Sequence, residues 1–191
     1  MNKLLLTSLM TIGAAMVCSN AYSFQPDYEK KFMAPLAKED TTEIAKQLKI
    51  LQATVDALCI KTRGFTANIV SADFYEFHNF YNLTIKFLQE ASYEISERVR
   101  SLGVMANTTV ADIQEMSKVQ DAKSVLTDPK DTVAELVKDY VTVSNLARGI
   151  FRMAASIGDA GTIALTSKTT NQLEHFWWEL GVMAEGSKSV K

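Results

Sequence analysis

The 191-residue sequence contains only two cysteines, two histidines and three prolines. Cys59 is the one cysteine beyond the first 23 residues, and it lies in an apolar helical pattern where a buried, unreactive thiol is expected. Disulfides are therefore excluded as the framework of the fold. No low-complexity segment and no repeat of solenoid length interrupts the chain. The length predicts a single domain that buries a core without covalent cross-links.

The sequence also lacks an apolar run long enough to predict a membrane span. The apolar stretch Leu4–Val17 follows a basic start and precedes a small-x-small sequence at Ala21–Ser23. This order is typical of a cleavable signal peptide, so residues 1–23 are predicted to be removed and the mature chain to have no span. A lipoprotein anchor at Cys18 is the alternative, but a smaller residue than valine is expected before such a cysteine. We therefore expect a periplasmic or secreted protein.

An excess of positive charge is missing as well. Cleavage before Phe24 removes one lysine and no acid, which leaves 19 basic and 22 acidic residues and a formal net charge of −3. The predicted domain spans residues 41–186, with an extension of residues 24–40 before it and a tail of residues 187–191 after it. The extension is close to neutral, because it holds Lys30, Lys31 and Lys38 against Asp27, Glu29, Glu39 and Asp40. Such a chain has no general attraction for phosphate backbones, so nucleic-acid binding is not expected.

Helical periodicity is what the sequence has in abundance. Asp40, with Glu43 three residues later as a capping pair, predicts a first helix that runs to about Gly64 or Ala67. A second helix is predicted to begin after Ser71 as its cap and to stop at Gly103. Apolar residues recur at spacings of three and four in both: Ile44, Leu48, Leu51, Val55 and Leu58 in the first, and Phe74, Phe77, Tyr81, Leu88, Ile95, Val99 and Leu102 in the second.

Two further helices follow a long connection. Asp128 as cap and Pro129 at the first helical position predict the third, and the fourth begins near Asp159 and reaches the region of Gly186. Their apolar positions are Val133, Leu136, Tyr140, Val143, Ile150, Met153 and Ile157, then Ile163, Leu173, Trp177, Leu180 and Met183. In the connection, Thr109 with Asp112 predicts a short capped helix over residues 110–116. Long, evenly striped helices predict an all-α, antiparallel four-helix bundle.

The segment from Gly64 to Gly103 resembles the metal-site segment of the Dps family of ferritin-like proteins. That family places a His late in one helix, a second His twelve residues on, an Asp four further, and Asp-x-x-x-Glu-Arg near the end of the next helix. In this sequence the positions hold Thr66, His78, Asn82, Tyr93, and Glu97 followed by Arg98. The spacing of the five positions matches the family pattern, while three of the five ligand residues are replaced.

Two more features share this register. The family has a short helix in the long crossover between helices two and three, and it ends with Asp-x-x-Thr and Leu-acid-x-x-x-Trp patterns. Here these are Asp159-x-x-Thr162 and Leu173-Glu-His-Phe-Trp-Trp178. The resemblance covers about residues 41–184. It implies a ferritin-like fold, a dodecameric shell built from two-fold dimers, and iron as the bound metal.

Ordinary ferritins hold two irons inside one bundle with Glu-x-x-His pairs, a pattern that this sequence lacks. His78 and Glu97 are nineteen residues apart, roughly 28 Å along one helix, so they can hold the same ion only across a two-fold interface, as the resemblance implies. At the other family positions, Thr66 offers a neutral hydroxyl, Asn82 a neutral carbonyl and Tyr93 a phenol. The replacements at Asn82 and Tyr93 delete two negative charges per site.

Two alternatives stay open at this stage. Glu76, Glu90 or Glu94 could replace the lost ligands, although acids on a helix surface are usually only solvated. His78 and Glu97 could instead make polar interface contacts, with Glu97 paired to Arg98 or Arg100 of a neighbour. His175 is expected to be a core or interface histidine bonded to a carbonyl rather than a ligand. Of the tandem pair Trp177 and Trp178, one is expected to fill the core and the other to meet a neighbouring subunit.

Family shells admit iron through three-fold pores lined with acids near the start of the last helix, where this chain has only Asp159. The sequence therefore predicts an exported Dps-like shell for iron binding, storage or detoxification, with ferroxidase activity weak or lost. The alternative is a non-enzymatic structural or interaction protein on a Dps-like cage whose metal site has decayed.

Overall fold

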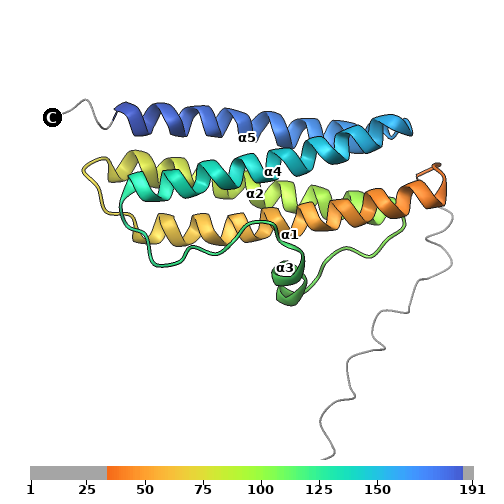
Figure 1. Ribbon diagram of the computed structural model, residues 1–191, viewed down its shortest axis with the longest axis horizontal. Coiled ribbons are helices and arrows are strands. Elements are labelled where there is room, and N and C mark those ends of the chain that lie inside the picture. Colours follow the sequence, from red (N-terminus) through yellow and green to blue (C-terminus); the bar gives the residue numbers. More distant parts are fainter. Residues whose placement is uncertain (1–33, 187–191) are drawn as a thin grey trace, which may run out of the picture.

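The computed structural model describes residues 34–186, and the regular elements of this part of the chain are all helices, with no strand (Figure 1). The predicted all-α class is confirmed. The elements are α1 (Lys38–Asn68), α2 (Phe74–Ser101), α3 (Val110–Met116), α4 (Pro129–Ser156) and α5 (Ala160–Gly186). The predicted signal peptide, residues 24–33 of the extension and residues 187–191 lie outside the described residues.

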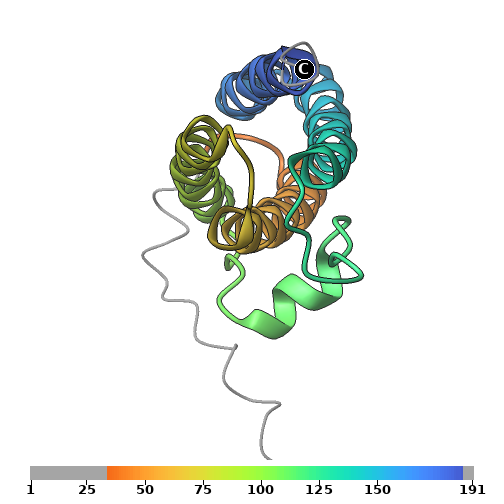
Figure 2. The same ribbon diagram turned by 90° about the vertical axis from the view of Figure 1, so that its left-hand side faces the viewer.

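The four long helices form two antiparallel pairs around one core. A short loop joins α1 to α2, and another joins α4 to α5, while the long crossover carrying α3 connects the pairs (Figure 1). The view along the bundle shows the four helices around a common centre, with α3 outside them on the α1 side (Figure 2). No helix of the described residues combines the length and apolarity that a membrane crossing requires.

Most of the predicted apolar stripes meet in this core. Fully buried residues from all four long helices include Leu48, Leu51, Leu58, Leu88, Ile95, Leu136, Tyr140, Leu173 and Leu180. Burying one such side chain stabilises the fold by about 1.5–3 kcal/mol. Phe176 of α5 adds an aromatic contact to α2, because its ring meets Phe80 and Phe87 edge-on at centroid distances of 5.7 and 5.6 Å.

Several helix ends were predicted from local sequence and are confirmed. Thr109 and Asp112 form a reciprocal capping box at the start of α3. Hydrogen bonds lower the pKa of Asp112, and the largest contribution comes from the backbone N–H of Thr108. Asp128 caps α4, with Pro129 at its first position. Gly103 ends α2 as predicted. Its φ of 84° lies in the left-handed region, where glycine is favoured.

Three predictions at the helix starts are wrong. Helix α1 begins at Lys38 with Ala37 in the cap position, so Asp40 lies inside the helix rather than capping it. Asp73, not Ser71, occupies the cap position of α2, while the Ser71 hydroxyl accepts a hydrogen bond from the Asp73 N–H. Phe74 is 45 % exposed, because the first turn of α2 extends past the end of the packed core.

Candidate functional site

His78 and Asn82 form the first of two polar pairs on the outer face of α2. They are four residues apart and therefore adjacent on the helix surface. Asn82 Nδ2 lies 3.2 Å from His78 Nδ1. The His78 ring also stacks against Phe74, with 5.0 Å between the ring centroids. The Asn82 amide therefore has the His78 imidazole as its hydrogen-bond partner.

Tyr93 and Glu97 form the second pair, with the same spacing. Both side chains are exposed, one turn apart on α2. Hydrogen bonding to the Glu97 carboxylate, followed by the charge of that carboxylate, raises the pKa of Tyr93 above its ordinary value. The phenol is therefore protonated at neutral pH.

Thr66, the third replaced position, faces the protein instead. Its side chain is buried near the end of α1, and Oγ1 donates a 2.7 Å hydrogen bond to the carbonyl of Thr62. A threonine hydroxyl turned back onto its own helix has satisfied its donor inside the fold. The position that the resemblance assigns to a ligand thus holds a structural hydroxyl.

The structure does not bring His78 and Glu97 together within one chain. His78 lies near the start of α2 and Glu97 near its end. Among residues 34–186, no three His, Cys, Asp or Glu side chains are close enough to hold a metal ion. A histidine nitrogen, a carboxylate and a phenol are nevertheless donors that iron accepts. That the two pairs are half-sites, joined into one metal site across a two-fold axis, stays a prediction.

Glu90 and Glu94, which the sequence left as replacement ligands, face α5 rather than the His78 end of the helix. Lys168 Nζ lies 2.6 Å from Glu94 and 3.2 Å from Glu90. The hydrogen bond to Glu94 is the main cause that raises the pKa of Lys168. Glu76 is exposed on the first turn of α2. None of the three joins a metal cluster in the described chain.

Arg98 is held by three partners at the junction of α2 with α5. Its Nη2 lies 2.5 Å from Asp159 Oδ1, its Nε donates to Thr162 Oγ1 at 3.0 Å, and its Nη1 donates to Ser101 Oγ at 3.2 Å. We call Arg98, Asp159 and Thr162 the clasp. Gly161 lies beneath it, since a Cβ there would come within 2.8 Å of Arg98 Nη1.

The clasp bears on two sequence predictions. An Arg98 engaged in this way is not a free partner for Glu97 of a neighbour. Asp159, assigned to a three-fold pore, is buried, accepts hydrogen bonds from Thr162 N and Oγ1 at 2.9 and 2.6 Å, and directly precedes α5. The pore assignment stays a prediction, and within the described chain the charge of Asp159 is balanced by Arg98.

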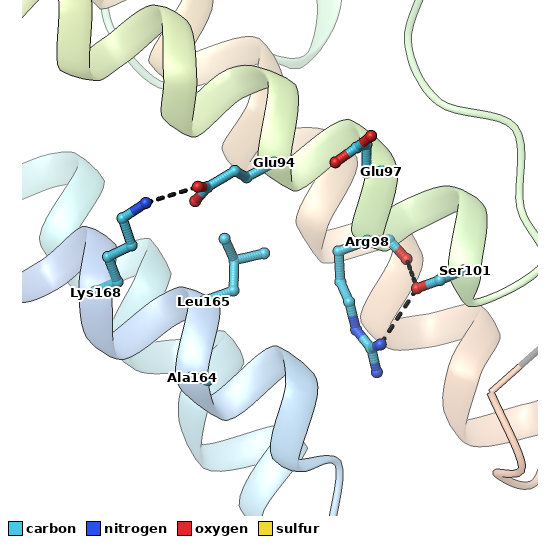
Figure 3. A pocket seen from close by; sticks show the side chains of 7 residues that line it. All are labelled: Glu94, Glu97, Arg98, Ser101, Ala164, Leu165 and Lys168. Atoms are coloured by element: carbon cyan, nitrogen blue, oxygen red, sulfur yellow. Dashed lines mark hydrogen bonds and ion pairs between the residues drawn. The ribbon is translucent and has the colours of Figure 1, made fainter.

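A groove of about 440 Å³ runs between α2 and α5 beside the second pair (Figure 3). Figure 3 shows Glu94 directed toward Lys168 and the guanidinium of Arg98 directed away from Glu97. The residues that line the groove are Glu94, Glu97, Arg98, Ser101, Ala164, Leu165 and Lys168. The groove therefore has an apolar floor with ion pairs at its rim, and Glu97 lies at that rim.

A buried ion pair between α1 and α4 was not predicted. Lys61 Nζ lies 2.8 Å from Asp139 Oδ2 and 3.6 Å from Glu135 Oε2. Burial raises the pKa of Asp139, and the hydrogen bond from Lys61 opposes that shift. The sequence did carry a signal, because each residue follows a buried leucine by three positions, Leu58 and Leu136, and so continues an apolar stripe.

Two expectations for α5 are wrong where they place a side chain in the core, while their placement at a subunit interface stays a prediction. His175 is half-exposed, and its Nε2 lies 3.4 Å from Glu179 Oε1, so it is neither buried in the core nor bonded to a carbonyl. Trp177 and Trp178 are 49 % and 58 % exposed, and neither fills the core of the chain. Phe176 takes that place against α2.

Comparisons with known proteins agree with this architecture. The ferritin-like domain family matches residues 45–187. The nutrient stress-induced DNA-binding protein of Nostoc sp. is 26 % identical over 134 residues, which are 70 % of this chain and 72 % of that protein. A Haemophilus influenzae protein without an assigned function is 23 % identical over 143 residues, 75 % of this chain and 89 % of the relative.

Solved structures of Dps proteins have the same fold. The Dps protein of Vibrio cholerae O1, described as a member of a broad superfamily of ferritin-like diiron-carboxylate proteins, matches with a TM-score of 0.76 at 22 % identity. The match covers 80 % of this chain and 97 % of that one. Mycobacterium smegmatis Dps matches with a TM-score of 0.74 at 19 % identity, over 78 % of this chain and 91 % of that one.

Proposed function

The chain belongs to the ferritin-like family, and from this premise we propose that it is an exported iron-binding protein that forms a closed shell. The shell holds about twelve chains built from two-fold dimers. It stores or sequesters iron, and its ferroxidase activity is weak or lost. Iron is the cargo, and it binds where α2 helices of two subunits meet.

The observation that carries this proposal is the outward placement of both half-sites. Glu97 is exposed and His78 is half-buried, and they lie at opposite ends of α2. Two copies of α2 that run antiparallel about a two-fold axis bring His78 of one chain toward Glu97 of the other, because an isologous interface pairs each residue with its counterpart's partner. The bundle interior offers no comparable set of ligands in the described residues.

Weak oxidation follows from the replaced ligands. Asn82 is neutral and hydrogen-bonded to His78, Tyr93 is protonated, and Thr66 is turned toward Thr62. Ferrous iron that loses an electron gains a positive charge, and fixed negative charges stabilise that product. With two carboxylates fewer per site than the family pattern, the site supports binding better than catalysis. We therefore assign the site to one iron rather than to a two-iron centre.

An interaction function on the same cage is the second candidate. It is favoured by the large apolar side chains that α5 exposes to solvent, Trp177, Trp178 and Val182. A name that includes DNA binding belongs to the Nostoc relative. For this chain we propose no nucleic-acid binding, since the mature net charge of −3 provides no electrostatic attraction to phosphates.

The two histidines allow a matched test of iron binding. His78→Ala removes the imidazole of the proposed site, and His175→Ala removes the imidazole beside Glu179. We expect His78→Ala shells to hold fewer interface irons at low iron loading, with assembly unchanged by light scattering. His175→Ala should retain the wild-type content. Equal iron content in wild type and His78→Ala would leave the interaction function as the better account.

A further inference from the structure

The extension of residues 24–33 joins the described chain at one end of the groove between α2 and α5. The backbone N–H of Ala34 donates a 3.0 Å hydrogen bond to the carbonyl of Ser101, which lines the groove (Figure 3). Ala34 and Leu36 also pack against the core, so the position of this junction is fixed. We propose that residues 30–33 dock in the groove of their own chain and cover its apolar floor.

The segment 30–33 has the length that the groove requires. The α2 side of the groove extends over seven residues, from Ser101 back to Glu94, which is roughly 10 Å along the helix axis. Four residues of extended chain span about 13 Å. Pro35 favours an extended backbone at Ala34, the residue before it. A segment that starts at Ser101 and continues in this conformation therefore reaches the far end of the groove.

The composition of the segment matches the surface beneath it. Its sequence, Lys30-Lys31-Phe32-Met33, combines two apolar side chains with two cations. Ala164 and Leu165 of α5 give the groove an apolar floor, and neither is fully buried in the described chain. Phe32 on this floor would remove apolar surface of both partners from water, which favours the docked state.

The charges are complementary as well. Arg98 is paired with Asp159, so its charge is already balanced. Lys168 is the other basic residue among the described residues that line the groove. It faces three acids, Glu90, Glu94 and Glu97, of which it pairs with the first two. The resulting excess of two negative charges equals the two positive charges of Lys30 and Lys31.

The covalent connection selects the chain's own segment as the occupant. A ligand that is tethered at the edge of its site has a high effective concentration there, whereas a separate partner loses translational freedom on binding. Docking also places both lysines against acids, so the basic part of the extension is not presented to phosphate groups. This inference goes beyond the proposed function and requires no metal.

Disulfide trapping in the full-length, metal-free protein tests the docking. Cys18→Ala and Cys59→Ala remove the native thiols, and Phe32→Cys is then combined with Ala164→Cys in the groove. The matched control combines Phe32→Cys with Ser96→Cys, because Ser96 lies on α2 between groove residues but does not line the groove. A disulfide requires Cα atoms within about 7 Å of each other, so a docked segment forms it selectively.

With diamide as the oxidant, we expect an intrachain disulfide to form about tenfold faster with Ala164→Cys than with Ser96→Cys. Non-reducing electrophoresis and mass spectrometry of the linked peptides measure both rates. Lys30→Glu together with Lys31→Glu should slow the reaction with Ala164→Cys about tenfold, since each surface ion pair contributes a few-fold. Equal rates at the two positions, a disulfide between two chains, or a rate unchanged by the charge reversal would overturn the inference. Each of these results leaves the proposed function untouched, because iron takes no part in the experiment.

Discussion

Arg98 Nη2 lies 2.5 Å from Asp159 Oδ1, and this contact ties the last turn of α2 to the first turn of α5. Thr162 completes the clasp, because it donates to Asp159 and accepts from Arg98 Nε. The clasp fixes the end of α2 that carries Glu97. The orientation of the second half-site therefore depends on a contact between residues that are 61 positions apart in sequence.

Arg98→Ala is expected to destabilise the fold strongly. The substitution leaves Asp159 buried without its cation, and breaking a buried pair in this way typically costs about 3–5 kcal/mol. Arg98 is partly solvent-accessible, so we expect the lower end of that range. Arg148→Ala is the control, since Arg148 and Glu174 form an exposed pair whose loss should cost less than about 1 kcal/mol. Urea unfolding of both variants measures the difference, and equal losses would contradict the role of the clasp.

Two glycine substitutions in α5 should have opposite effects. Gly161→Ala places a methyl group 2.8 Å from Arg98 Nη1, and the arginine cannot yield without releasing its three partners. We expect a lower melting temperature. Gly181→Ala meets no atom within 4 Å, so the higher helix propensity of alanine should stabilise the protein by up to about 1 kcal/mol. A melting temperature that rises in both variants would show that Arg98 is free to move.

The Lys61–Asp139 pair should be coupled in a double-mutant cycle. Lys61→Met leaves the buried Asp139 carboxylate without its closest cation, at an expected cost of about 3 kcal/mol or more. Adding Asp139→Leu to that variant removes the stranded charge and should recover much of the loss. If the double variant is as unstable as the sum of the single variants, the two groups do not interact as the structure indicates.

Asp139 also makes stability depend on pH in a defined direction. Burial raises its pKa in the folded protein above the ordinary value of 3.8, so the folded protein holds this proton more tightly than the unfolded chain does. The resulting stabilisation is fully present below pH 3.8 and is lost as the pH rises through the folded pKa. The free energy of unfolding of wild type, minus that of Asp139→Asn, should therefore fall across this window. A difference that rises with pH would mean that the hydrogen bond and charge of Lys61 lower the pKa of Asp139 more than burial raises it.

Restoring the ligands of the family pattern should accelerate iron oxidation. The variant with Thr66→His, Asn82→Asp and Tyr93→Asp regains two carboxylates and one imidazole per site. We expect its initial rate of ferrous iron oxidation in air to exceed the wild-type rate by on the order of tenfold or more. Oxygen consumption and absorbance measured on assembled protein give the two rates. A wild-type rate that already equals the restored rate would show that the replaced ligands are sufficient.

Local sequence predicted the features that depend on neighbouring residues. The capping box of Thr109 and Asp112 and the start of α4 at Asp128 and Pro129 were placed correctly, because a cap is made within one turn of its helix. The helical stripes gave most of the core for the same reason. Asp40 was placed wrongly, because the helix begins two residues earlier, at Lys38, where no side-chain cap marks its start.

Pairings between distant residues could not be predicted in this way. A charged side chain in a stripe, such as Lys61, signals that a partner exists, but only the packed bundle identifies it as Asp139. The stripe likewise gives the buried side of α5 without saying which residue of the run 176–178 points into the core. The proposed contact between His78 and Glu97 is harder still to predict from sequence, because it forms between two chains.

Iron carried by the assembled protein shows whether this chain forms an iron-binding shell. Purified protein is exposed to ferrous iron in air, fractionated by size with in-line light scattering, and analysed for iron in every fraction. We expect iron to coelute with an assembly of about twelve chains, in an amount of about one atom per chain or more. A stable monomer, or an assembly that elutes without iron, would contradict it.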